Sequence, residues 1–339
     1  MAGTLAPTTS GTSTPGTEEN RFTVALDRLV NSGTFLIIPI IVIMLGLWYF
    51  TDAFMTTENL LRVARAASIY AIIGVGQTFV ITSGNIDLSV GSSIALTGAI
   101  TGTYLVGGGS VPRAMLLSVV VATILGIING YIVAWLGVPA LLATLGTLIT
   151  YRGAVLEYMG SEYHVRFPDA IVFLGQGYIG IIPMPVIIAL ATAALGGFLF
   201  RFTKFGRVTV AIGGNETAAI LAGINVKFWK LMIYAFQGFL VGIASLVLIG
   251  RLNAAHPSTG QLMELHVIAG VVLGGTLLFG GKGFIFGSLL GMFLIGVLEN
   301  GLLIAGLGFF WQQIVLGILL IFAVGLQMSR SRNKKSVLK

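Results

Sequence analysis

The chain has 339 residues, of which 56% are hydrophobic and only 9% are charged, and its formal net charge is +7. In soluble globular domains about a quarter of the residues are charged, so this composition excludes an ordinary soluble enzyme or binding module. The basic residues are not gathered in one patch with exposed aromatic residues, which argues against nucleic-acid binding. With a mean hydropathy of +0.97, the chain is predicted to be an all-α polytopic membrane protein.

The beginning of the chain differs from the rest, because residues 1–20 are rich in Thr, Ser, Gly and Pro. This composition predicts a disordered tail, which we place at residues 1–30. The tail lacks the basic and apolar regions of a signal peptide, so the first apolar segment is expected to remain as a membrane helix. We expect one transmembrane domain at residues 31–328 and a basic tail at residues 329–339.

Apolar segments long enough to cross the membrane follow one another along most of the chain. A helix needs about 20 residues to cross the ~30 Å hydrocarbon layer. This length predicts about ten transmembrane helices, at residues 34–50, 65–82, 90–107, 114–136, 138–152, 184–200, 231–250, 265–281, 284–304 and 309–327.

The basic residues separate by membrane side when these spans are threaded through a bilayer. One side receives the larger set, which comprises Arg21, Arg28, Arg201, Lys204, Arg207, Lys227, Lys230, Lys282, Arg330, Arg332, Lys334, Lys335 and Lys339. The other side receives the smaller set, namely Arg62, Arg65, Arg113, Arg152, Arg166 and Arg251. Because cytoplasmic loops carry the excess of Lys and Arg, both termini are predicted to lie in the cytoplasm.

Two short patterns recur in the second half of the chain. The stretch "DLSVGSSIALTG" from Asp87 aligns with "ELHVIAGVVLGG" from Glu264, and "INGYIVAWLG" from Ile128 aligns with "ENGLLIAGLG" from Glu299. The match is weak enough that coincidence stays an alternative. If it is a repeat, each half holds an odd number of spans, so the two five-helix halves have inverted orientations, an arrangement that recurs in transporters.

Several polar side chains interrupt this apolar sequence, most densely in "SGNIDLSVGSS". Polar groups at membrane depth usually face a bundle interior or an aqueous cavity. They are therefore candidates for lining a translocation pathway for a hydroxyl-rich solute: Gln77, Asn85, Asp87, Ser89, Asn129, Glu264 and Asn300. Two other interpretations remain open, since Asp87 and Ser89 can cap a helix and the others can form hydrogen bonds between helices.

The longest connection on the basic side, residues 201–230, contains a helix signal of its own. Asn215 is a good N-cap residue and Glu216 favours the positive end of the helix dipole. Alanines follow from Ala218, and Gly223 can end the helix. We expect a short helix held among basic residues and suited to press on a partner, with a plain interfacial connector as the alternative.

The sequence offers no catalytic or metal site. The chain contains 3 histidines and no cysteine, and the histidines are scattered. The stretch "GTLLFGGKG" from Gly275 superficially resembles a phosphate-binding loop but lacks the first glycine and the final Ser or Thr. We therefore expect no catalytic residue, no cofactor in this chain and no ATP hydrolysis by it.

Three stretches together resemble one family, the permease subunits of bacterial ABC importers for monosaccharides such as ribose, xylose, arabinose and galactose. They are "GNIDLSVGS" (Gly84–Ser92), "FGRVTVAIGGNETAAILAGINV" (Phe205–Val226) and "ELHVIAGVVLGGTLLFGGKG" (Glu264–Gly283), and the resemblance covers about Phe50 to Leu326. It implies the permease fold and a coupling helix that docks into a cytoplasmic ATPase, which binds the ATP and Mg. The coupling residues would be Gly213, Gly214, Asn215, Glu216, Ala218, Ala219 and Gly223.

The same resemblance implies the partners and the place of the protein. Two permease copies, as a homodimer in membrane lipid, would form one pathway across the bacterial inner membrane. A periplasmic or lipid-anchored binding protein would deliver the sugar. The expected mechanism is alternating access, with closure of the ATPase dimer moving the Asn215 helix.

Two departures leave the substrate open. Ribose permeases tend to carry Asp where this chain has His266, and the run Ile128–Gly153 looks like the permeases for rhamnose and for autoinducer-2. Rivals from other classes also remain. An ion-coupled secondary transporter would need a coupling acid, for which Asp87, Glu264 and Glu299 are the candidates, and a passive channel would need no coupling helix.

Overall fold

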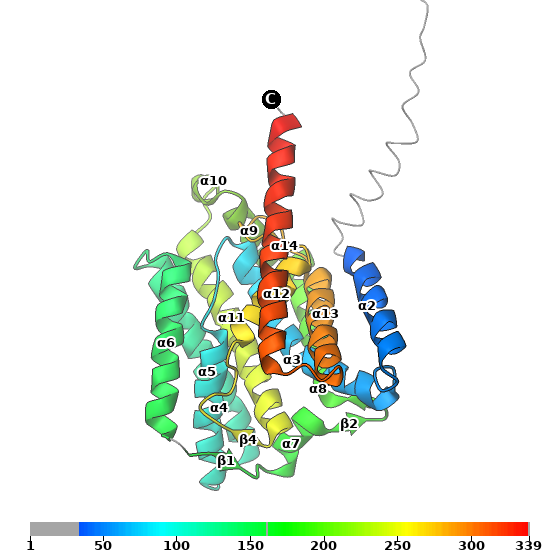
Figure 1. Ribbon diagram of the computed structural model, residues 1–339. Helices are drawn as coiled ribbons and strands as arrows, with labels where there is room; N and C mark the ends of the chain where they lie inside the picture. The colour runs from blue at the N-terminus through cyan, green and yellow to red at the C-terminus, as the bar shows by residue number, and fades with distance from the viewer. Residues whose placement is uncertain (1–33, 161, 338–339) are drawn as a thin grey trace, which may run out of the picture.

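The computed structural model describes residues 34–160 and 162–337, and these form a bundle of helices (Figure 1). The predicted tail at residues 1–30 lies outside the described residues. The first half of the bundle contains the short 3-10 helix η1 (Thr34–Leu36) and α2 (Ile37–Phe50), α3 (Thr57–Thr82), α4 (Val90–Val106), α5 (Val111–Ala134) and α6 (Ala140–Met159). The second half contains α8 (Met184–Phe202), α11 (Val226–Leu252), α12 (Met263–Leu273), α13 (Ile285–Ile304) and α14 (Phe309–Val337).

Each predicted span overlaps one of these helices, which confirms the polytopic all-α interpretation. Among the described residues, α3, α5, α8, α11 and α13 are long and apolar enough to cross a membrane by length and composition alone. Shorter apolar helices cover Ile37–Phe50, Val90–Val106, Met263–Leu273 and Phe309–Gly325. In Figure 1, α2 begins and α14 ends on the face that carries the surface helices α9 (Lys204–Gly214) and α10 (Glu216–Leu221).

The eighth predicted span, residues 265–281, is wrong in its second part. Helix α12 ends at Leu273 after 11 residues, a length of about 16 Å, or roughly half of the hydrocarbon layer. The chain continues as a loop to α13, and Gly275, Gly280 and Gly281 in this loop have positive φ angles. Residues 274–281 are apolar enough to resemble a span, but their glycines turn the backbone away from a helix.

Small strands connect the ends of the bundle on the face opposite α9 and α10, and the all-α expectation did not include them (Figure 1). Strand β1 (His164–Val165) pairs antiparallel with β4 (Ala254–Ala255), and β2 (Tyr178–Ile179) pairs with β3 (Ile182–Pro183). The short helix α7 (Asp169–Gln176) lies between β1 and β2 in the chain. Strands of two residues have no detectable alternation in sequence, so the prediction missed them.

The packing of the helices repeats between the two halves. Helix α5 packs against α11 as α13 packs against α3, and α4 contacts α6 as α12 contacts α14. Helices α3 and α11 pack against each other at the centre. Helix α3 ends and α11 begins on the α9 and α10 face, so these counterparts run in opposite directions (Figure 1). The halves are therefore inverted relative to each other.

Helices α3 and α11 form the core of the bundle. In their apolar 18-residue stretches, 78% of the residues of α3 and 72% of those of α11 are buried, compared with 28% for the peripheral α8. Lipid tails are as apolar as leucine, so membrane helices associate chiefly through close packing rather than through hydrophobic burial. The core must therefore be held by contacts that bring helix backbones together.

Paired glycines provide such a contact between α5 and α11. Gly126 and Gly130 lie four residues apart on α5, as do Gly238 and Gly242 on α11. A Cβ atom on Gly126 would lie 3.1 Å from the Gly238 Cα, and one on Gly242 would lie 2.7 Å from the Val119 Cα. The small faces thus let the two backbones approach closely, in the manner of GxxxG motifs.

Candidate functional site

The loop between α3 and α4 carries the densest set of predicted polar residues. Asp87 Oδ1 accepts hydrogen bonds from the Ser89 backbone N–H at 2.8 Å and from the Ser89 hydroxyl at 2.7 Å. Helix α4 begins directly afterwards, at Val90. The Asp87 side chain therefore satisfies the backbone N–H of Ser89, the residue directly before α4, but no side-chain hydrogen bond caps α4 itself, so the predicted capping role is met only as a local turn.

A buried polar network extends from Asp87 and Ser89 to three further helices. Asn129 Nδ2 of α5 donates to Ser89 Oγ at 2.7 Å, and Gln77 Nε2 of α3 donates to the Asp87 carbonyl at 3.3 Å. Gln237 Nε2 of α11 donates to Gln77 Oε1 at 3.3 Å. All of these residues are at most 2% exposed. The network therefore joins α3, α4, α5 and α11 inside one chain.

Two acceptors of this network stay without a hydrogen-bond partner among the described residues, namely Asn129 Oδ1 and Gln237 Oε1. Burying an unpaired carbonyl oxygen costs about 1–3 kcal/mol. Four of the predicted pathway residues thus come together, but they are enclosed between helices rather than open to a cavity. Their role in a pathway stays a prediction, whereas their hydrogen bonds between helices are present in the structure.

The other predicted pathway residues lie elsewhere. Asn85 is 6% exposed, and its Nδ2 donates to the Ser83 carbonyl and hydroxyl oxygens at 3.2 and 2.9 Å. Asn300 of α13 exchanges two hydrogen bonds of 2.9 Å with Asn59 of α3. Glu264 of α12 lies against Gly91 of α4, where a Cβ atom would overlap its carboxylate. Among the described residues, Glu264 and Asn300 share no hydrogen bond with the Asp87 network, although Glu264 lies against Gly91, two residues after Ser89.

A second polar cluster, which the sequence did not bring together, joins α3, α12 and α13. His266 Nε2 lies 2.7 Å from Glu299 Oε1, and the Tyr70 hydroxyl donates to the same oxygen at 3.2 Å. The Tyr70 and His266 rings stack with their centroids 5.3 Å apart. Next to the cluster is a pocket of about 340 Å³ lined in part by Tyr70, Arg251, Thr259 and Gln261. The available signal was the pair of ionisable residues, His266 and Glu299, within predicted spans.

The predicted surface helix is present as α10. The Asn215 side chain accepts a hydrogen bond from the Ala218 N–H at 2.9 Å, so Asn215 is the N-cap. Gly223, with φ of 79°, follows the last turn as a left-handed residue that ends the helix. The local signals of capping and termination are thereby confirmed. The preceding helix α9, with Val208 and Ile212 buried, was not predicted.

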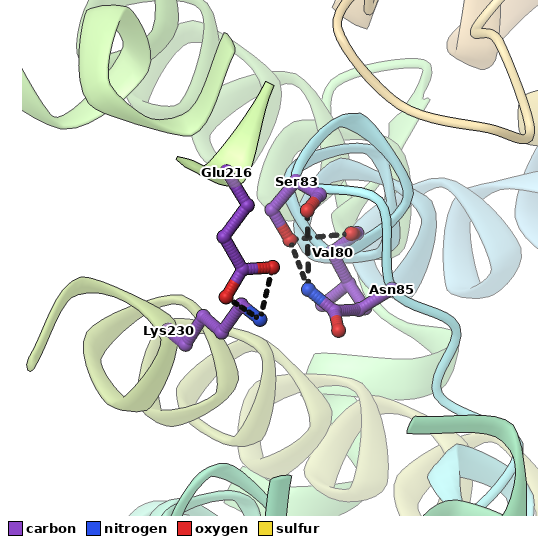
Figure 2. Close-up of polar contacts among 5 residues, drawn as sticks. All are labelled: Val80, Ser83, Asn85, Glu216 and Lys230. Carbon is purple, nitrogen blue, oxygen red and sulfur yellow. Dashed lines mark hydrogen bonds and ion pairs between the residues drawn. The ribbon is translucent and has the colours of Figure 1, made fainter. Parts of the chain in front are cut away.

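Ala219 is the one buried residue of α10, and the other five residues of this helix are exposed. Ala219 is 4% exposed and packs with Val208, Ile212 and Val226, whereas Ile220 and Leu221 are exposed. Lys230 at the start of α11 lies 2.8 Å from both carboxylate oxygens of Glu216 (Figure 2). The helix is thus fixed to α11 on one side while it presents an apolar tip to the outside.

A pocket of about 480 Å³ lies between α10, the start of α11 and the connection from α5 to α6. Its lining includes Glu216, Ile220 and Lys230 together with Asn85 from the loop that leads to Asp87. Figure 2 shows Ser83 and Asn85 beside the Glu216 and Lys230 pair. The surface helix and the loop before α4 therefore border the same space.

Comparisons with known proteins place this arrangement in a family. Residues 59–324 match the family described as branched-chain amino acid transport system / permease component. The ribose import permease protein RbsC of Bacillus subtilis is 38% identical over 88% of this chain and 93% of the relative. The D-allose transport system permease protein AlsC of Escherichia coli is 39% identical over 87% and 90%. The xylose transport system permease protein XylH of Haemophilus influenzae is 34% identical over 89% and 96%.

No solved structure matches the chain. The relatives confirm the resemblance that the three motifs carry. Together with the membrane-spanning helices, these bacterial relatives show a multi-pass protein of the inner membrane. The family match covers more than half of the chain, and the chain therefore belongs to this family of transport-system permease components.

Proposed function

We propose that this chain is the permease subunit of an ATP-driven importer that carries a monosaccharide or similar small polyol across the inner membrane. The names of its relatives, for ribose, allose and xylose, support a sugar as the substrate. A separate ATPase binds ATP and Mg, a second permease copy completes the pathway, and a periplasmic or lipid-anchored binding protein delivers the sugar. The face with α9 and α10 is then cytoplasmic, and both termini lie there.

The observation that carries the proposal is the construction of α10. Its buried Ala219 and its ion pair with Lys230 anchor a capped helix outside the bundle, with Leu221 84% exposed at its end. Ile220 and Leu221 are adjacent exposed apolar side chains on a helix that lies among basic residues, and we take this tip as the contact for a protein partner. The resemblance assigns this segment to the contact with an ATPase, and the structure gives it a fitting shape.

Alternating access follows from this arrangement. Closure of the ATPase dimer on ATP displaces α10, and the two inverted halves rearrange around a polar passage that binds the sugar weakly. Weak binding suits transport, because tight binding would slow release. The chain itself performs no chemical step.

Two of the three acids that an ion-coupled carrier could use, Asp87 and Glu299, have structural partners. Asp87 accepts hydrogen bonds from the Ser89 N–H and hydroxyl, and Glu299 is paired with His266 and Tyr70. These contacts favour the ATP-driven function over the secondary transporter.

Rhamnose and autoinducer-2 remain alternative substrates. A panel of labelled pentoses, hexoses, rhamnose and autoinducer-2 in an uptake assay separates them.

The test compares two matched substitutions with the candidate ATPase. Leu221 and Ile181 are both 84% exposed, but Leu221 ends α10 whereas Ile181 lies in the turn between β2 and β3 on the opposite face. Leu221→Arg is expected to abolish co-purification of the ATPase and sugar-stimulated ATP hydrolysis, while Ile181→Arg retains co-purification. Equal binding of the ATPase to both variants would contradict the proposed role of α10.

A further inference from the structure

The backbones of three chain segments meet at the end of α9, directly before α10. The first is the end of α9 at Gly213, the second is the end of α3 with Thr82 and Gly84, and the third is the loop after α12 with Gly280 and Gly281. We call these residues the glycine junction. It connects the helix that precedes α10 with one loop from each half of the chain.

The contacts in the glycine junction leave no room for a side chain at Gly213 or Gly280. The Gly281 N–H donates to the Thr82 carbonyl oxygen at 2.9 Å. A Cβ atom on Gly213 would overlap that same oxygen and lie 2.6 Å from the Gly281 nitrogen. A Cβ atom on Gly280 would lie 2.8 Å from the Gly84 Cα and 2.9 Å from the Gly213 oxygen. An added methyl group at Gly213 or Gly280 would therefore collide with a neighbouring backbone, which shows that the three backbones pack directly against one another, and close-packed segments transmit displacement to each other.

Both loops of the junction are tied to membrane helices. The loop after α3 leads directly into α4 and is held there by the hydrogen bonds of Asp87 with Ser89. The loop after α12 is held by Gln327 of α14, whose Nε2 donates to the Thr276 carbonyl at 2.9 Å and whose Oε1 accepts from the Leu278 N–H at 3.2 Å. A displacement of the junction therefore reaches α4 in one half and α14 in the other.

We propose that the glycine junction transmits the movement of α9 and α10 to both halves of the permease as one rigid unit, with Gly213 as its central positioning residue. The inference rests on the proposed function, because it takes α10 as the point where the ATPase acts. The inference adds the contacts through which a displacement of α10 by the ATPase would reach the transmembrane helices. A flexible hinge at the consecutive glycines Gly213 and Gly214 is the opposing explanation.

The neighbouring glycines separate these explanations. Gly213 is packed as described, whereas a Cβ atom on Gly214 would have no described atom within 4 Å. Gly213→Ala therefore disturbs the junction, and Gly214→Ala adds the same methyl group and the same stiffness to the backbone without a steric overlap. Gly197→Ala in α8 is the inert control, because its added Cβ also meets open space among the described residues.

The experiment reconstitutes the complete complex with ATPase and binding protein in proteoliposomes and measures three quantities: co-purified ATPase, ATP hydrolysis and sugar uptake. For Gly213→Ala we expect normal co-purification of the ATPase with loss of sugar-stimulated hydrolysis and of uptake. Gly214→Ala and Gly197→Ala are expected to transport like the wild type. Normal uptake by Gly213→Ala, or an equal loss in Gly214→Ala, would overturn the proposal.

These outcomes are separable from a failure of the proposed function. If α10 does not bind the ATPase, Leu221→Arg leaves co-purification intact, whereas a failed junction leaves the effect of Leu221→Arg in place. A tether provides a second measurement should Gly213→Ala fail to assemble. The chain contains no cysteine, so Gly214→Cys combined with Phe279→Cys allows a short bifunctional maleimide to bridge the junction. Uptake that survives the tether supports one rigid unit, and uptake lost only after tethering contradicts it.

Discussion

Asp87 is an ionisable residue, and in the structure its side chain acts as a hydrogen-bond acceptor. Its Oδ1 takes the Ser89 N–H and hydroxyl, and the residue is 2% exposed. A carboxamide has an acceptor oxygen of the same shape, whereas a methyl group has none. The acceptor role towards Ser89 and a role for the charge in transport therefore predict different effects of substitution.

Asp87→Asn is expected to keep stability and uptake close to those of the wild type, because the amide oxygen can replace Oδ1. Asp87→Ala leaves the Ser89 N–H buried without its partner and is expected to lower the free energy of unfolding by about 1–3 kcal/mol. Thermal unfolding of the purified variants in detergent measures this difference. Loss of uptake in Asp87→Asn at normal stability would show that the charge itself is needed.

Among the elements, the contact between α5 and α11 depends on small side chains at four positions. Gly238→Leu is expected to force the helices apart, since a Cβ atom there would lie 3.0 Å from the Thr123 Cα. Overpacking of a tight contact costs about 1–3 kcal/mol, and this rigid backbone contact belongs at the upper end. The control is Gly197→Leu, because an added Cβ atom at Gly197 meets no described atom within 4 Å. Equal thermal midpoints for the two variants would refute the role of the glycine faces.

The elements also show how far sequence reasoning reaches. Helix α10 was predicted because Asn215 and Gly223 signal its ends locally. The buried network was not, because Gln77 and Gln237 meet only after helices distant in sequence have packed together. The span predicted at residues 265–281 is longer than α12, since hydropathy does not distinguish an apolar glycine-rich loop from a membrane helix. Local signals were readable, and contacts that depend on tertiary packing were not.

At the scale of the whole molecule, the orientation of the bundle follows from the charge distribution. The α9 and α10 face carries the basic residues of the long connection, and the turn between β2 and β3 lies on the opposite face (Figure 1). Since basic loops remain in the cytoplasm, the first face is expected to be cytoplasmic. The absence of cysteine from the chain makes single reporter cysteines specific.

A membrane-impermeant maleimide added to intact spheroplasts is expected to label Ile181→Cys and to spare Thr217→Cys in α10. In inside-out vesicles the pattern should reverse. Both positions are exposed on the isolated chain, so reactivity in detergent serves as the control for each. Labelling of Thr217→Cys from outside would invert the topology and remove the proposed site for a cytoplasmic ATPase.

The measurement that tests the account most directly is the energy source of uptake. The chain is reconstituted in proteoliposomes with its candidate ATPase and binding protein, and labelled sugar uptake is followed with proton and sodium gradients collapsed. The account predicts uptake that requires ATP and the binding protein and that survives the loss of both gradients. Uptake without ATP, or uptake that disappears with either gradient, would contradict it and identify a secondary carrier.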